Sequence, residues 1–228
     1  MFDFRYDSII ENTEKSLEKL KIKYADMVFA HDVEFGDLNT IFNETLPALQ
    51  CIKDSGKAKY IGISGYSLKT LNRINIDAIL TYSRYVLFDE TLNEIIEFFK
   101  EREIFIVSGS PTGMGLLTQN GPPSWHPAHT MLKDRCQKVS VECEKNQINI
   151  SELAIKHVIN NRSIDMVLIG PKNINEMRNC VQAVNTPLSD EECNFITRIK
   201  SLYFDDLDVS VRSWEGVEKA HLIERKKG

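Results

Sequence analysis

Apolar residues follow two spacings along the chain, one typical of amphipathic helices and one typical of buried strands. A first helix is predicted by positions at helical spacing with Glu and Lys opposite them: Ile9, Ile10, Thr13, Leu17 and Leu20. The short apolar run Tyr24–Ala30 then ends at His31 and Asp32, as expected of a buried parallel strand that leads into a polar loop.

This helix and strand pattern repeats to the end of the chain. The predicted strands are Tyr24–Ala30, Lys59–Ser64, Ala78–Tyr82, Ile104–Ser108 and Met166–Ile169. The later predicted helices are Leu38–Ile52, Asp89–Arg102, Ala128–Asn146, Ile150–Asn160, Ile174–Val184 and Asp190–Tyr203, followed by an irregular tail.

About five strands that alternate with helices predict an α/β fold with parallel pairing, because hairpin turns between neighbouring strand patterns are missing. A doubly wound sheet and a (β/α)8 TIM barrel both fit this alternation. Neither glycine-rich nucleotide motif, G-x-G-x-x-G or G-x-x-x-x-G-K-[ST], occurs in the sequence. The pattern therefore favours the barrel, with residues 1–228 as a single domain.

Composition narrows the class of partners. The net charge is −5, and no segment concentrates enough Lys and Arg to follow a phosphate backbone, so nucleic acid is not expected as a partner. No apolar run reaches the ~18 residues that a membrane helix needs, and the N-terminus lacks a signal pattern. A cytoplasmic protein without membrane contact is expected, and its five cysteines are expected to be reduced and mostly buried.

In a barrel the loops that leave the carboxyl ends of the strands build the functional site. These positions form a polar, glycine-containing set: His31–Asp32, Ser64–Gly65, Tyr82–Tyr85, Ser108–Gly113 and Gly170–Asn173. A single histidine at a strand end is more often structural than catalytic, so this position alone does not define a site.

Several segments, in order along nearly the whole chain, resemble the aldo-keto reductase family. They are Asp26–Asp37, Lys59–Gly65, Ser108–Ala128 and Leu168–Asn173. More narrowly, His31–Asp32, the Gly121–Pro127 loop and Ser213–Gly216 resemble the branch of L-galactose dehydrogenase-like proteins. The resemblance implies NAD- or NADP-dependent oxidation or reduction of a small sugar or carbonyl compound, an aldose such as L-galactose.

By this resemblance, His31 corresponds to the histidine that orients the reacting carbonyl or alcohol, and Ser64 to a residue that holds the nicotinamide carboxamide. Gly65 stands where the family usually has Asn, so it supplies no amide side chain.

The resemblance assigns the remaining cofactor contacts to two later loops. Ser110, Thr112 and Gly113 correspond to the segment around the pyrophosphate, although by themselves they are an ordinary turn.

Gly170, Lys172 and Asn173 correspond to the segment around the adenosine, where Asn173 could equally be a helix N-cap. The family often continues with Glu-Asn, whereas this chain has Asn179 and Cys180, which leaves the choice between NAD and NADP open.

The two histidines of Trp125–His129 have no third ligand nearby in sequence, so a packed loop with a helix start is preferred and no metal site is predicted.

The family also uses an Asp, a Tyr and a Lys beside the histidine, on strands that precede the region matched here. The chain is therefore expected to be an N-terminally truncated, partial barrel with weak or no activity by itself, since a missing proton donor costs ~10²–10⁴-fold in rate. The alternative is a non-catalytic barrel remnant that binds or oligomerises, with self-association through open barrel edges.

Overall fold

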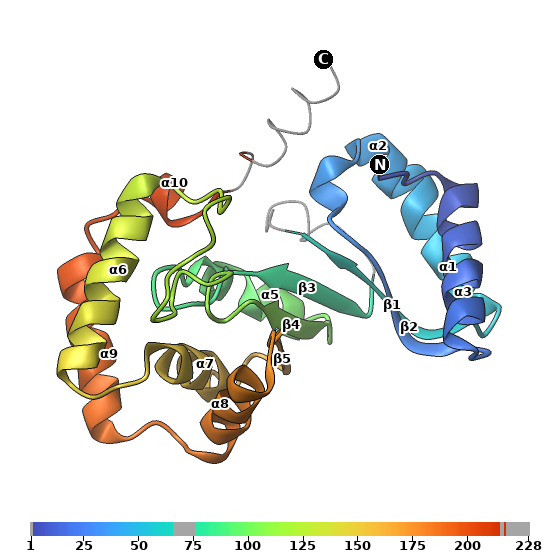
Figure 1. Ribbon diagram of the computed structural model, residues 1–228. Coiled ribbons are helices and arrows are strands. Elements are labelled where there is room, and N and C mark those ends of the chain that lie inside the picture. The colour runs from blue at the N-terminus through green and yellow to red at the C-terminus, as the bar shows by residue number, and fades with distance from the viewer. Residues whose placement is uncertain (1, 66–75, 215–216, 218–228) are drawn as a thin grey trace. The chain divides into compact units, whose positions relative to one another are not determined.

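The computed structural model describes residues 2–65, 76–214 and 217, and it shows strands alternating with helices (Figure 1). The strands are β1 (Ala25–Ala30), β2 (Ala58–Ser64), β3 (Ala78–Tyr82), β4 (Phe105–Gly109) and β5 (Met166–Leu168). The longer helices are α1 (Tyr6–Leu20), α3 (Leu46–Asp54), α6 (Thr130–Lys145), α7 (Ile150–Asn160), α8 (Ile174–Asn185) and α9 (Asp190–Tyr203). Most of these bounds lie within three residues of those predicted from the sequence.

The strands form a five-stranded sheet in the order β1-β2-β3-β4-β5, and the pairs β1–β2 and β2–β3 are parallel. Each strand therefore neighbours the next strand in sequence. A doubly wound sheet would reverse its strand order at a switch point, whereas a barrel does not. The predicted barrel-type α/β fold is confirmed.

The chain divides into two compact units, of which the first comprises residues 1–81 and 95–107. In this unit α1 packs on α3 and β1, and α3 packs on β2 (Figure 1). The core of this unit is aliphatic, with Ile41, Leu49, Ile52 and Ile63 each at most 1% exposed.

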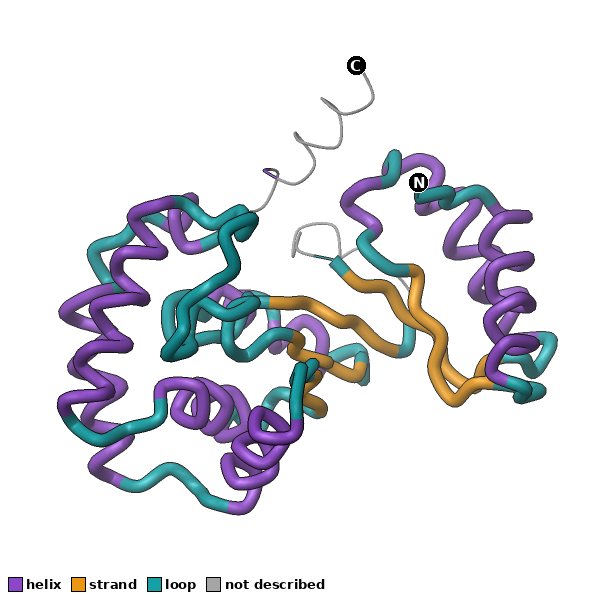
Figure 2. The backbone as a smooth tube through the Cα atoms, viewed as in Figure 1, coloured by secondary structure: helices purple, strands orange, loops and turns teal. Residues whose placement is uncertain are grey.

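The second unit comprises residues 82–94 and 108–228. Its helices pack in the pairs α7–α8, α6–α9 and α6–α7. An aromatic cluster fills part of the interior: the ring of Phe88 lies 6.1 Å from that of Phe204 and 6.5 Å from that of Trp214. Figure 2 shows the long loop that separates β4 from α6, which contains three of the predicted cofactor residues, Ser110, Thr112 and Gly113.

Two predicted helices are irregular in the structure. The helix predicted over Leu38–Ile52 consists of α2 (Leu38–Thr40), a wide π turn at Ile41–Thr45, and α3. Pro47 lies just after the wide turn, and proline both lacks an N–H and clashes with the carbonyl four residues before it, which the wider turn relieves.

The helix predicted over Asp89–Arg102 is reduced to a 3₁₀ turn, Thr91–Glu94, and α5 (Ile96–Lys100). The Asp89 carboxylate accepts hydrogen bonds from the Thr91 N–H (2.8 Å) and hydroxyl (2.6 Å), which holds this segment in a tight turn. The tail predicted to be irregular contains a short helix, α10 (Val209–Arg212), capped by Asp208.

Candidate active site

His31 directly follows β1, and its ring is 71% exposed. Its Nδ1 lies 3.0 Å from the carboxylate of Asp32. Burial raises the pKa of Asp32, and the neighbouring His31 partly offsets that shift. A carboxylate at Nδ1 fixes the ring so that Nε2 faces outward, where it can accept a hydrogen bond from an alcohol or, when the ring is protonated, donate one to a carbonyl.

Ser64 ends the neighbouring strand β2 and is 1% exposed. Its Oγ accepts a hydrogen bond from the backbone N–H of Asp32 (3.0 Å). Asp32 adopts a left-handed backbone conformation (φ 56°), which turns the chain sharply after His31. In the first unit, Asp32 thus connects His31, the predicted catalytic residue, to Ser64, the residue predicted to hold the carboxamide of the cofactor.

Glu34 is a neighbour of this site that sequence reasoning missed. A Cβ atom at Gly65 would lie 2.6 Å from Oε2 of Glu34, so the carboxylate occupies the space beside Gly65. An Asn at position 65 would compete with it for that space. The absence of a side chain at Gly65 therefore leaves room for the Glu34 carboxylate.

In the second unit, the loop of Ser110, Thr112 and Gly113 is folded tightly on itself. Left-handed φ angles occur at Ser110 (59°), Gly113 (59°), Met114 (55°) and Gly115 (102°). Such turns direct N–H groups inward, as in anion-binding nests.

Most donors of this loop are engaged internally. The N–H of Gly113 donates to the carbonyl of Ser110 (2.8 Å), and the N–H of Met114 donates to the Ser110 hydroxyl (2.9 Å). Within the described part of the chain, the N–H and hydroxyl of Thr112 have no partner. Thr112 is therefore the donor in this loop that best fits a phosphate oxygen.

The other predicted cofactor residues of this unit, Gly170, Lys172 and Asn173, directly precede α8. Asn173 is the N-cap and accepts hydrogen bonds from the N–H groups of Asn175 and Glu176. The Glu176 carboxylate in turn accepts from the Lys172 N–H (2.7 Å) and the Asn173 side chain (3.0 Å). The capping role of Asn173 is thus present, and a carboxylate already stands at the helix start, where it would repel a 2′-phosphate.

The same unit brings the two cofactor segments together. The N–H of Ser110 donates to the carbonyl of Leu168 at the end of β5 (3.1 Å), two residues before Gly170. A Cβ atom at Gly170 would meet no atom within 4 Å, so the surface there is open.

His126 supports the Ser110–Gly115 loop and was not predicted to act on it. The side chain is 2% exposed; Nε2 lies 3.1 Å from the Gly113 carbonyl, and Nδ1 accepts from the Ala128 N–H (3.1 Å). The ring also meets Trp214 edge-on at 4.8 Å. With His129 capping α6, the predicted packed loop and helix start are confirmed. Glu215 and Gly216 lie outside the described residues.

Comparison with known proteins shows which family the chain belongs to. Residues 1–201 match the Aldo/keto reductase family. The chain belongs to this family. It is 37% identical over 190 residues to the L-galactose dehydrogenase of Arabidopsis thaliana, covering 80% of this chain and 60% of that protein. It is 26% identical to the D-arabinose 1-dehydrogenase of Saccharomyces cerevisiae, covering 69% of this chain and 51% of that protein.

The aldo/keto reductase fold is also seen in solved structures. The holo form of an aldo-keto reductase from Bacillus halodurans superposes with a TM-score of 0.73 at 24% identity, over 93% of this chain and 70% of that chain. The chain spans 60% of the length of the Arabidopsis relative and 51% of the length of the Saccharomyces relative. Among the described residues, no group of three His, Cys, Asp or Glu side chains could hold a metal ion, and no helix is long and apolar enough to cross a membrane.

Proposed function

We propose that this protein carries the cofactor-binding part of an NAD(P)-dependent oxidoreductase that acts on an aldose, such as L-galactose, or on a related small carbonyl compound. The observation that carries the proposal is the junction of His31 and Ser64 through Asp32. It occurs in a chain 37% identical to an L-galactose dehydrogenase. The proposed place of action is the cytoplasm, and no nucleic acid or membrane partner is proposed.

Each residue has a defined task in this proposal. When bound, the nicotinamide cofactor would accept or supply the hydride. His31 would orient the substrate oxygen through Nε2, and the buried Ser64 hydroxyl would donate to the carboxamide. Thr112, with Ser110 and Gly113 shaping its loop, would bind the pyrophosphate, and Gly170, Lys172 and Asn173 would border the adenosine.

The chain by itself is proposed to be weakly active or inactive. In the family pattern the Asp, Tyr and Lys that handle the proton precede the region matched by this sequence, and His31 is the one tetrad member that carries over. Removal of a general acid typically lowers the rate by ~10²–10⁴-fold. We also predict that residues 1–228 form a single, partly closed barrel domain.

Both NAD and NADP remain candidates, and the contacts of Glu176 favour NAD. Its carboxylate lies at the start of α8, beside the backbone of Lys172. An acidic group near the ribose suits a free 2′-hydroxyl and opposes a 2′-phosphate.

Thermal unfolding with and without saturating NAD or NADP tests the proposal directly, because a ligand that binds the native state raises the midpoint by mass action. We expect a larger rise with NAD than with NADP, and a smaller rise for a Thr112→Val variant. The Leu202→Ala variant, at an exposed position of α9, is the control (59% exposed). A cooperative transition that neither cofactor shifts would contradict the proposal.

A second candidate function is that of a non-catalytic barrel remnant that self-associates. It is favoured by β1, which ends the sheet order and has no second strand neighbour among the described residues. Light scattering at micromolar concentration tests it: a particle of twice the chain mass would support it, and a monomer would contradict it.

A further inference from the structure

The turn that follows β1 meets the end of β2 at two consecutive residues. The backbone N–H of Asp32 donates to the hydroxyl of Ser64 (3.0 Å). Two residues further along the turn, Oε2 of Glu34 lies 2.6 Å from the position that a Cβ atom of Gly65 would take. Ser64 and Gly65 are both buried. This corner of the first unit therefore brings one hydroxyl and one carboxylate to the end of β2.

The Glu34 carboxylate takes the place of a side chain that position 65 lacks. In an asparagine, the amide oxygen lies roughly 2.4 Å from the Cβ atom, because the two intervening bonds are about 1.5 Å and 1.2 Å long. The 2.6 Å separation at Gly65 is close to that value. Oε2 of Glu34 thus supplies an acceptor at the distance from Cβ at which an asparagine would hold its own amide oxygen.

The Ser64 hydroxyl supplies the matching donor. Its oxygen accepts the Asp32 N–H, and a hydroxyl can donate as well as accept. The described residues provide no acceptor for the Ser64 proton. A buried donor without an acceptor costs free energy, which a ligand oxygen at this position would recover.

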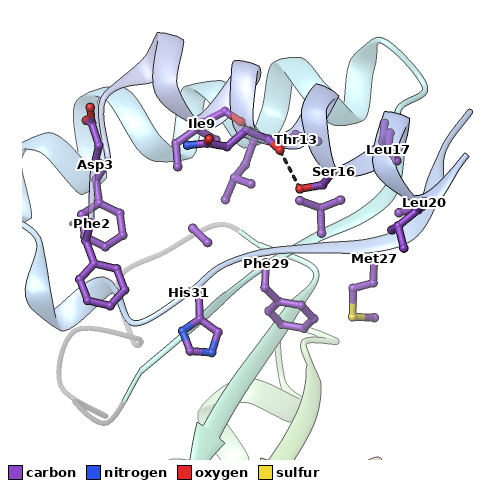
Figure 3. A pocket seen from close by; sticks show the side chains of 16 residues that line it. Phe2, Asp3, Ile9, Thr13, Ser16, Leu17, Leu20, Met27, Phe29 and His31 are labelled. Carbon is purple, nitrogen blue, oxygen red and sulfur yellow. Dashed lines mark hydrogen bonds between the residues drawn. The ribbon is translucent and has the colours of Figure 1, made fainter. Parts of the chain in front are cut away.

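His31 faces a different space from this corner. It borders a groove of about 450 Å³ that is lined mainly by α1 and β1 (Figure 3). Neither Ser64 nor Glu34 lines that groove. Between His31 and Glu34, the left-handed backbone of Asp32 turns the chain sharply. A substrate oxygen at His31 and a group held by Ser64 and Glu34 would therefore not compete for the same protein atoms.

A hydroxyl donor beside a carboxylate acceptor is complementary to a primary amide. Such an amide carries an oxygen that accepts and an NH2 group that donates, both on one carbon atom. An ionised carboxylate can only accept, and hydrogen bonds to it are stronger than those between neutral groups. A ligand carboxylate in place of the amide would bring two like charges together at Glu34.

We propose that Glu34 is a cofactor-binding residue, whose carboxylate accepts a hydrogen bond from the carboxamide NH2 of the nicotinamide while the Ser64 hydroxyl donates to the carboxamide oxygen. This assignment rests on the proposed function, in which Ser64 binds the carboxamide. Gly65 permits the arrangement, since a side chain there would fill the space of the Glu34 carboxylate.

Two ligands that differ in one group test the role of Glu34. In 3-acetylpyridine adenine dinucleotide, a methyl group replaces the NH2 of the carboxamide, while the oxygen and the ring charge are kept. Calorimetric titration of the 228-residue chain should give about tenfold tighter binding of NAD than of this analogue. Glu34→Ala should reduce that ratio to about one by weakening NAD alone. Glu34→Gln keeps an acceptor oxygen and should give a ratio of about three.

Two further variants serve as controls. Ser64→Ala should weaken NAD and the analogue by the same factor, because both ligands carry the carbonyl oxygen. Glu18→Ala removes an exposed carboxylate of α1 and should leave the ratio unchanged, which controls for the change in net charge.

ADP-ribose, which lacks the nicotinamide, separates this assignment from the proposed function. Its affinity should be the same for the original chain and for Glu34→Ala, which also shows that the variant is folded. If ADP-ribose binds, equal affinities of the original chain for NAD and the analogue would overturn the assignment, as would an unchanged ratio in Glu34→Ala. If neither ADP-ribose nor NAD binds the original chain, the proposed function is wrong, and the assignment of Glu34 fails with it.

Discussion

A buried, neutral histidine stabilises the loop assigned to the pyrophosphate. Because Nδ1 of His126 accepts from the Ala128 N–H, the proton of the neutral ring resides on Nε2 and is donated to the Gly113 carbonyl. Burial lowers the pKa of His126, while the hydrogen bond to Gly113 raises it in part. The native state therefore opposes protonation of this ring.

The first prediction concerns pH. Since the pKa of His126 is lower in the folded state than the ordinary value near 6.5, its contribution to stability is complete above that value and is lost as the pH falls through the folded pKa. We expect His126→Gln to reduce this pH dependence and to lower the free energy of unfolding by about 1–3 kcal/mol at pH 7.5. Urea unfolding from pH 7.5 to 5 measures both effects.

The control is His129→Asn, which retains an N-cap acceptor for the Met131 N–H and leaves His126 in place. It should keep the pH dependence of the original chain. A His126→Gln protein with an unchanged pH profile would show that another group is responsible.

The second prediction concerns the space beside Gly65. Gly65→Asn restores the residue usual in the family, but its Cβ would lie 2.6 Å from Oε2 of Glu34. The free energy of unfolding should fall by about 1 kcal/mol, and the double change Glu34→Ala with Gly65→Asn should recover part of that loss. Strict additivity of the two single changes would show that the residues do not compete.

These residues show how far a sequence can define a site. His31 and Ser64 were predicted because they stand at the ends of strand patterns and match the order of segments in a family. Glu34 and His126 were not, because their importance arises from contacts with Gly65 and Gly113 that no spacing rule relates. Strand ends are set by local periodicity, whereas these contacts depend on how the loops fold back.

At the scale of elements, β1, β2 and β3 approach closely around Gly62. A Cβ atom there would lie 2.5 Å from the Phe29 ring and 2.6 Å from the carbonyl of Ala78. Periodicity predicted all three strands, but it gave no reason for glycine at the centre of β2. The reason is that the Phe29 ring lies across the strand, which leaves no room for a side chain.

The third prediction is that Gly62→Ala lowers the free energy of unfolding by about 3 kcal/mol or more, because a backbone carbonyl cannot move aside as a flexible side chain can. Gly170→Ala is the matched control, since a Cβ there meets nothing within 4 Å. It should change stability by less than about 0.5 kcal/mol. Denaturant unfolding of both variants gives the comparison, and equal stabilities would contradict the close approach.

The fourth prediction concerns α8. Glu176→Gln keeps the hydrogen-bonding shape of the helix start and removes its negative charge. The ratio of NADP to NAD affinity should rise by about two- to fivefold, a modest effect because the site is exposed and screened. Calorimetric titration measures both affinities. Asn175→Gln, one position earlier on the same helix, should leave the ratio unchanged.

At the scale of the whole molecule, the sequence predicted the fold class well because strand and helix periods alternate cleanly over the chain. It did not predict the polar contacts that join distant segments of the second unit. Lys156, 5% exposed, pairs with Glu152 on its own helix and with Glu192 on α9, both at 2.9 Å. Such ion pairs depend on which helices become neighbours, information that a residue period does not contain.

The fifth prediction concerns the five thiols, all of which are free. Cys136, Cys143 and Cys180 are buried, and burial raises the pKa of each, in Cys143 to about 12. Cys51 and Cys193 are exposed. A thiol-reactive dye at pH 8 should therefore label two cysteines quickly in the native chain and all five after unfolding. Rapid labelling of four or five in the native chain would contradict the described core.

The close approach of three strands at Gly62 has a consequence for how this sequence can drift. A side chain at that position would meet the Phe29 ring and the carbonyl of Ala78 together. A smaller residue at position 29 would relieve the first contact but not the second, because a backbone carbonyl is present whatever residue supplies it. Relatives that keep this strand arrangement should therefore keep glycine at this position, even where the residue at position 29 differs.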